Sequence, residues 1–115
     1  MGKLIRKIDE KKLRANHQRN AALNGETIDL EPVVKFFNPV GAATWLISEL
    51  DDDGIAFGLC DLGFGSPELG YVSVDELAVV KVGFGLGIER DRHFTAKKTL
   101  GEYAAEAREK GSISA

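Results

Sequence analysis

Hydrophobic side chains are sparse in the first 25 residues, and their spacing fits one narrow face of a helix. Leu13 and residues 21–23 would form that face, with Asp9 as the N-cap and Asn24-Gly25 as the C-terminal stop. A stripe this thin offers little apolar area for burial, so we expect the helix to dock loosely. The hydrophobic residues that come next follow Pro32, which favours extended chain.

The middle of the chain carries runs of β-branched and aromatic side chains, interrupted by turn residues. We therefore expect strands over residues 33–37, 44–48 and 55–60, with turns at 38–41 and 51–54. In the third strand, large side chains alternate with Ala, Gly and Cys, so the large face should point into the core.

Two Ser/Thr residues with a glutamate three positions later predict where further helices begin, because this spacing forms a capping box. Ser73 would cap a helix over residues 74–80, and Thr99 would cap one over residues 100–110 that Gly111 ends. The apolar side of the second helix would consist of Leu100, Tyr103, Ala104 and Ala107.

Together these elements predict an α+β fold. Short strands are expected at residues 71–72 and within 89–95, on either side of the middle helix. The strands would form a single small antiparallel sheet of four to five strands, with an N-terminal helix, a short middle helix and a C-terminal helix packed mainly on one face. We expect a single domain over residues 1–115, made of a basic helix (1–25), a sheet-forming body (32–95) and a C-terminal helix (99–110).

Charge is distributed unevenly around a formal net charge of −3. The first 20 residues carry seven Lys and Arg, whereas residues 36–80, the acid-only stretch, carry eight Asp and Glu and no Lys or Arg. Segregation of this kind shapes the choice of partner rather than the fold. We expect the stretch to fold into one negative face that binds a protein with a basic surface through Glu49, Asp51, Asp53, Asp61 and Glu68. Residues 51–54 lack the spacing of a calcium loop and are interpreted as a hairpin turn.

Composition argues against two classes of protein. No apolar run approaches the roughly 20 residues that span a bilayer, and no apolar stretch follows the basic N-terminus, so we expect neither membrane contact nor a secretory signal. The single cysteine fits a reducing compartment, and we expect a cytoplasmic protein. Cys60 lies in the acid-only stretch, which would raise its pKa, so we do not expect it to act as a nucleophile.

The densest polar segment is Glu89-Arg90-Asp91-Arg92-His93. In a strand, Glu89, Asp91 and His93 would share one face, where two acids and an imidazole suit acid–base chemistry or metal binding. The alternative is an edge strand with cross-strand ion pairs. Side chains on one face of a straight strand lie roughly 6.5–7 Å apart, so three in a row converge poorly on one ion. We therefore expect no metal and no cofactor.

Basic residues return in the last third of the chain. Arg90, Arg92, Lys97 and Lys98, together with the N-terminal helix, form a candidate surface for nucleic acid. The preceding segment, residues 83–87, has glycine at alternate positions but lacks the final glycine of the dinucleotide fingerprint. We interpret it as a structural loop, and the two neighbouring arginines leave phosphate contact open.

Several segments, taken in order, carry a resemblance to a known family. They are residues 34–41 (VKFFNPVG), 44–45 (TW), 57–63 (FGLCDLG), 68–73 (ELGYVS) and 84–91 (FGLGIERD). This ordered set resembles the bacterial "domain of unknown function 2958" family over roughly residues 4–94. The resemblance implies a setting on plasmids, phages and other mobile elements, near conjugation or anti-restriction genes. It assigns no catalytic residue and no ligand.

The function that we expect is that of a small accessory protein of a bacterial mobile element, which binds another protein through its acidic face and catalyses no reaction. Two alternatives stay open. One is a nucleic-acid-binding accessory protein that uses the basic N-terminal helix with Arg90 and Arg92. The other is an enzyme centred on Glu89, Asp91 and His93. The sequence leaves the oligomeric state open.

Overall fold

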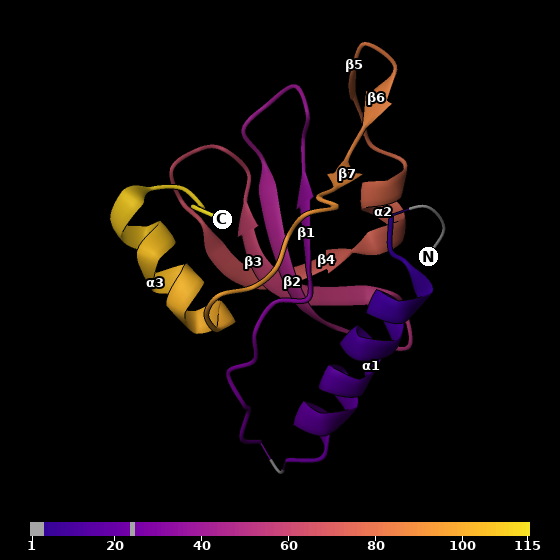
Figure 1. Cartoon of the computed structure of the whole chain (residues 1–115), viewed down its shortest axis with the longest axis vertical. Helices are drawn as coiled ribbons and strands as arrows, with labels where there is room; N and C mark the ends of the chain where they lie inside the picture. Colours follow the sequence, from indigo (N-terminus) through magenta and orange to yellow (C-terminus); the bar gives the residue numbers. More distant parts are fainter. Residues whose placement is uncertain (1–3, 24) are drawn as a thin grey trace.

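The structure is a computed structural model that describes residues 4–23 and 25–115, and a five-stranded antiparallel sheet in the order β4-β3-β2-β1-β7 lies at its centre (Figure 1). In this part of the chain, three helices and a small β5–β6 hairpin surround the sheet. The strands are β1 (Val34–Phe37), β2 (Thr44–Leu50), β3 (Ile55–Asp61), β4 (Glu68–Ser73), β5 (Lys81–Gly83), β6 (Leu86–Gly87) and β7 (Glu89–Arg90). The helices are α1 (Lys7–Ala21), α2 (Val74–Ala78) and α3 (Leu100–Lys110). The predicted α+β class is confirmed.

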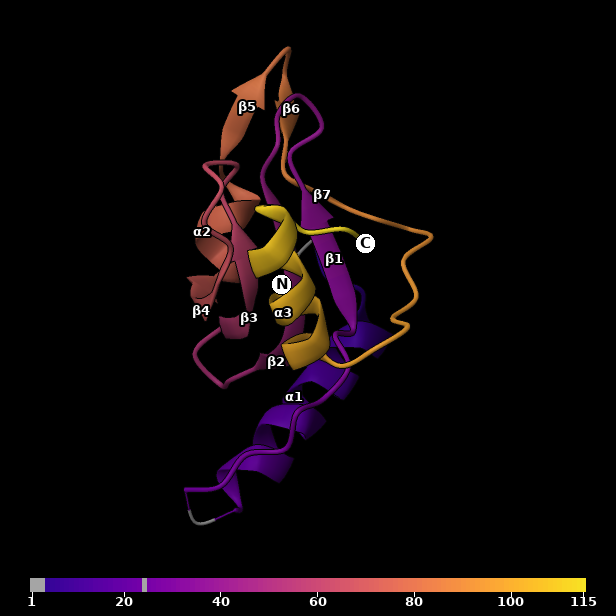
Figure 2. The ribbon, with the colours of Figure 1, turned by 90° about the vertical axis from the view of Figure 1, so that its left-hand side faces the viewer.

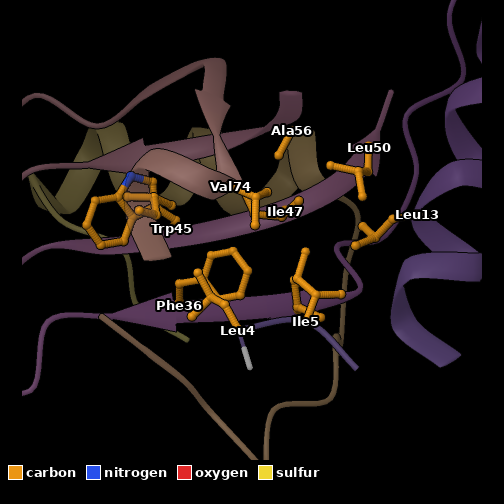
Figure 3. Packing of buried hydrophobic residues seen from close by; sticks show 11 residues of the cluster. Leu4, Ile5, Leu13, Phe36, Trp45, Ile47, Leu50, Ala56 and Val74 are labelled. Atoms are coloured by element: carbon orange, nitrogen blue, oxygen red, sulfur yellow. The ribbon is translucent and has the colours of Figure 1, made fainter. Parts of the chain in front are cut away.

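Helices cover both faces of the sheet, which corrects the expectation that they pack mainly on one (Figure 2). α1, α2 and residues 4–5 pack on one face around Ile47 (Figure 3). α3 packs on the other face, where its apolar side meets Leu46 and Leu59. The strands β2 and β3 therefore bury side chains in both directions. Ala56 and Leu59, which point to opposite faces of β3, are both 0% exposed. The large residue Leu59 packs in the core beneath α3, and the small residue Ala56 packs in the core beneath α1 and α2.

The predicted caps of the two later helices are confirmed. Ser73 Oγ accepts a hydrogen bond from the Glu76 N–H at 3.2 Å and begins α2, which ends slightly before the expected residue 80. Thr99 and Glu102 form a complete capping box at the start of α3. Gly111 ends that helix in the left-handed conformation, with φ of 79°.

The start of α1 differs from the prediction. Its N-cap is Arg6, so Asp9 lies in the first turn and is not the cap. The guanidinium of Arg6 instead donates to both carboxylate oxygens of Asp9, at 2.9 and 3.2 Å. At the other end α1 stops at Ala21, and Gly25 adopts a positive φ of 84°. Asn24, the other half of the predicted stop, lies outside the described residues.

α1 docks through polar contacts as well as through its thin apolar stripe. Leu13 is fully buried, and the side-chain amide of Asn16 donates to the Ser48 carbonyl of β2 at 3.0 Å. Arg14 donates to the Asp51 carbonyl at 2.7 Å. These side-chain bonds to backbone carbonyls fix the helix against β2 and the first residue after it. The docking is therefore firmer than the spacing of apolar residues predicts.

The region after β3 departs most from the expectation. β4 begins at Glu68, earlier than residues 71–72, and the segment interpreted as a structural loop forms the β5–β6 hairpin. Phe84 lies at the tip of that hairpin with φ of 56° and is 93% exposed. β7 ends at Arg90 because Asp91 turns the chain, accepting the His93 N–H on its Oδ1 at 2.8 Å. Residues 92–94 are thus not a strand.

Candidate functional site

A β-bulge in β2 determines where the acidic side chains of the middle of the chain point. The register between β2 and β3 shifts between Ile47 and Glu49, which leaves Ser48 as the extra residue. After the shift Glu49 lies opposite Phe57, and Leu50 lies opposite Ala56. Without the bulge, strict alternation would turn Glu49 toward the core beneath α1 and Leu50 away from it. The bulge therefore places a carboxylate on the face that carries α3.

Glu49 is enclosed and has few partners. Its side chain is 14% exposed and accepts a hydrogen bond from Asn20 Nδ2 at 2.9 Å. Its other carboxylate oxygen lies 3.7 Å from Nδ1 of His17. Both partners come from α1. His17 was not expected to be part of a site, because the periodicity of α1 does not reveal that its polar face borders the sheet.

Glu49 opens on a cleft of about 400 Å³ between α1, the connector before β1, the start of α3 and the face of β2–β4. Its floor is apolar and is formed by Ile55, Phe57, Leu69, Tyr71 and Leu100. Tyr71 is 76% exposed even though its ring contacts that of Phe57, with the ring centroids 5.2 Å apart and the planes tilted by 54°. An exposed aromatic next to other partly exposed apolar residues is typical of a contact surface.

The rim of the cleft carries carboxylates. Asp51 uses Oδ1 to accept the N–H groups of Asp53 and Ile55, at 2.8 and 2.9 Å, and so holds the β2–β3 turn. Asp29 joins the connector to α3, accepting the Thr99 hydroxyl at 2.6 Å and the Gly101 N–H at 2.8 Å. A side chain at position 101 would clash with this carboxylate, which explains the glycine there. Asp29 was missed because nothing in the sequence near it suggests a site.

The predicted acidic residues do not all lie together. Glu49 and Asp51 line the cleft, Asp53 is exposed at the adjacent turn, and Glu68 is exposed at the far end of β4. Asp61 lies apart, at the other end of β3 from the turn, and is 2% exposed. Its two oxygens accept the N–H groups of Gly63 and Ile113, at 2.8 and 3.0 Å. Asp61 thereby fastens the C-terminal segment to the sheet.

Comparison with family models gives a match to DUF2958, described as "Protein of unknown function (DUF2958)", over residues 4–114. The chain belongs to this family. Comparison with curated proteins and with solved structures found no match. In the part of this DUF2958 chain that the structure describes, no helix has the length and apolarity to cross a membrane.

The basic residues of this DUF2958 protein are divided between two places. Arg90 and Arg92 line a hollow beside Leu4, and Nε of Arg90 is buried without a hydrogen-bond partner among the described residues. Lys98 instead pairs with Glu106 at 2.9 Å, which raises the pKa of the ammonium and lowers that of the carboxyl. The backbone N–H of Lys97 donates to the Tyr103 hydroxyl at 3.0 Å. The structure thus separates the two arginines from the two lysines.

The polar run of Glu89, Asp91 and His93 does not share one strand face. Glu89 is exposed on β7, whereas Asp91 and His93 lie in the turn that follows. Asp91 Oδ2 lies 3.6 Å from Nζ of Lys35, so this acid pairs with β1. Across residues 4–23 and 25–115, no three His, Cys, Asp or Glu gather at a spacing that suits a metal ion.

Cys60 lies on β3 and is part-buried against the core beneath α1 and α2. The pKa of its thiol is raised, as the sequence predicts, but the cause is burial rather than neighbouring acids. A thiol that resists deprotonation is a poor nucleophile. The residue acts as a small hydrophobic side chain here.

Proposed function

We propose that this protein is a non-enzymatic binding module, an accessory protein of a bacterial mobile element, that takes a basic and apolar segment of a partner protein into the cleft. The proposal rests on Glu49, a carboxylate that is 14% exposed, has only Asn20 and the more distant His17 as side-chain partners in the described part of the chain, and borders an apolar floor. The mobile-element setting comes from the family resemblance. The kind of partner is inferred from the charge and apolar surface of the cleft.

An enclosed carboxylate loses much of its hydration, and in a site of low polarity it gains most from a cation that approaches closely. The amide of Asn20 donates one hydrogen bond to the Glu49 carboxylate, and His17 lies at a longer distance of 3.7 Å from its other oxygen. A lysine or arginine from a partner would complete the set of contacts. Because such a pair is shielded from water, its loss weakens binding more than loss of a pair at the rim does.

The surroundings of Glu49 favour the same class of partner. Asp29 and Asp51 border the cleft, and the acid-only stretch, which supplies Glu49, Asp51 and most of the floor, contains no Lys or Arg. The negative electrostatic potential of these carboxylates attracts basic segments and repels acidic ones. The exposed rings and aliphatic groups of the floor, above all Tyr71 and Leu69, offer apolar contact next to the charge. Aromatic residues in such a position often dominate the binding energy of an interface.

The test is calorimetric titration of the full chain with a short peptide of alternating Lys and Val, compared with one of alternating Glu and Val. The Lys peptide should bind at about 0.15 M salt and the Glu peptide should not. Glu49→Gln should weaken binding by about tenfold. Glu109→Gln removes the same charge from an exposed position of α3 outside the cleft and should leave binding unchanged. Equal affinities for the two peptides, or for the two variants, would contradict the proposal.

A second candidate function has one observation in its favour. Nε of Arg90 is buried without a hydrogen-bond partner in the described residues, and Arg92 lines the same hollow. A phosphate oxygen would satisfy such a donor, as in proteins that bind nucleic acid. The net negative charge of the chain and the exposed Glu89 beside the hollow weigh against this alternative.

A further inference from the structure

The strand β4 lies at the margin of the sheet, at the opposite end from β7 (Figure 2). It pairs with β3 on one side, and no other described strand pairs with it on the other. Edge strands in natural proteins are commonly protected by lysine, proline or a covering element. β4 carries neither lysine nor proline, and Glu68, Leu69 and Tyr71 are exposed along it. It is therefore an open edge.

The register shows which backbone groups of β4 point outward. The N–H of Val74 donates to the Gly54 carbonyl at 3.1 Å, and these two residues continue the register in which Ser73 faces Ile55. In an antiparallel ladder, hydrogen-bonded pairs alternate with non-bonded pairs. The bonded pairs then fall on the even-numbered residues of β4. Leu69 and Tyr71 consequently direct their N–H and C=O groups away from β3.

The same two residues contribute side chains to the cleft. Leu69 lies opposite Leu59, and Tyr71 lies opposite Phe57, on the face of the sheet that carries α3. Both line the cleft floor next to the site of Glu49. A strand added to the edge of β4 would thus gain backbone hydrogen bonds from Leu69 and Tyr71 while every second side chain lay over the apolar floor.

We infer that β4 accepts an extended basic segment of the partner as a sixth strand of the sheet. The inference rests on the proposed function and adds the mode of recognition to it. Charge identifies the occupant, because Glu68 lies at one end of the edge and Asp53 lies next to the Gly54–Val74 pair at the other. A second copy of this chain would bring its own Glu68 and Asp53 against them. A segment with Lys or Arg at alternate positions would complement both ends.

Proline substitution separates backbone pairing from side-chain contact. Leu69→Pro removes an outward N–H and leaves the ladder with β3 intact, a position where edge strands tolerate proline. Leu69→Ala removes the side chain from the cleft and keeps the N–H. With the Lys-Val peptide, Leu69→Pro should lose about tenfold more affinity than Leu69→Ala. Equal losses in the two variants would overturn strand addition and leave the cleft proposal standing. Unchanged binding in both would overturn the two proposals together.

Amide hydrogen exchange of the unmodified chain provides a second test that does not depend on a variant folding. Addition of the peptide should protect the N–H of Tyr71, and the N–H groups of Gly70 and Val72, already bonded to β3, should change little. If the N–H of Tyr71 were instead protected without peptide, and more so at higher protein concentration, β4 would be pairing with a second copy of the chain. That result would overturn the proposal that a basic segment occupies the edge. Sedimentation of the same samples distinguishes the two outcomes.

Discussion

The side-chain amide of Asn20 and the carboxylate of Glu49 form a hydrogen bond of 2.9 Å between α1 and β2. Asn20 also accepts the Ile28 N–H at 2.7 Å and donates to the Ile28 carbonyl at 3.3 Å. One buried amide thus connects the helix, the connector and the sheet on the side of the cleft. Glu49 owes its position to this contact and to the bulge at Ser48.

Asn20→Ala should lower the free energy of unfolding by about 2 kcal/mol, because it leaves the Ile28 backbone groups and Glu49 short of partners. Asn16→Ala is the matched control, since Asn16 donates a single bond, to Ser48 at 3.0 Å. It should cost about 1 kcal/mol. Urea denaturation of both variants measures the difference. Equal costs would mean that Asn20 does not join the three elements.

Two glycines that face each other across β3 and β4 should respond oppositely to the same substitution. A Cβ at Gly58 would overlap the Leu46 carbonyl oxygen, whereas one at Gly70 would meet nothing within 4 Å. Gly58→Ala should therefore destabilise the protein by about 2 kcal/mol, since the strand backbone must move. Gly70→Ala should be neutral or slightly stabilising. Thermal unfolding midpoints compare them, and the same midpoint for both would exclude a close approach at Gly58.

Ser73→Ala should destabilise the protein by about 1 kcal/mol, because the Glu76 N–H at the start of α2 loses its acceptor. The helix has only a short apolar contact, through Val74 and Leu77, to compensate. Ser112→Ala, at an exposed position after α3, should change nothing. Thermal unfolding measures both, and an unchanged midpoint in the Ser73 variant would show that the cap is dispensable.

Features encoded within a few residues were predictable from the sequence. The caps at Ser73 and Thr99, the stop at Gly111 and the cores of the first three strands depend on local chemistry. The misplaced N-cap at Asp9 shows the limit, because a nearby arginine engages that carboxylate and the helix starts earlier. A capping residue is identified by what its side chain contacts.

The cleft depended on information that no short segment carries. Strict alternation in β2 gives the wrong face for Glu49, and only the pairing with β3 reveals the bulge that corrects it. His17 and Asn20 join the site because α1 docks along β2, a consequence of contacts more than 25 residues apart in the sequence. The prediction that Asp91 shares a strand face with Glu89 and His93 was wrong for a local reason. The Asp91 side chain accepts a hydrogen bond from the nearby backbone, which turns the chain and ends β7.

The chain should form no submicromolar complex with duplex DNA at about 0.15 M salt. Its net charge is −3, and the two lysines grouped with Arg90 and Arg92 in the sequence lie elsewhere, with Lys98 paired to Glu106. Two arginines beside Glu89 neutralise too few phosphates for tight binding. A gel-shift titration over several salt concentrations tests this, with Arg90→Ala/Arg92→Ala as the comparison. A tight complex of the unmodified chain that the double variant fails to form would make the phosphate site the main function and would move the cleft to a secondary role.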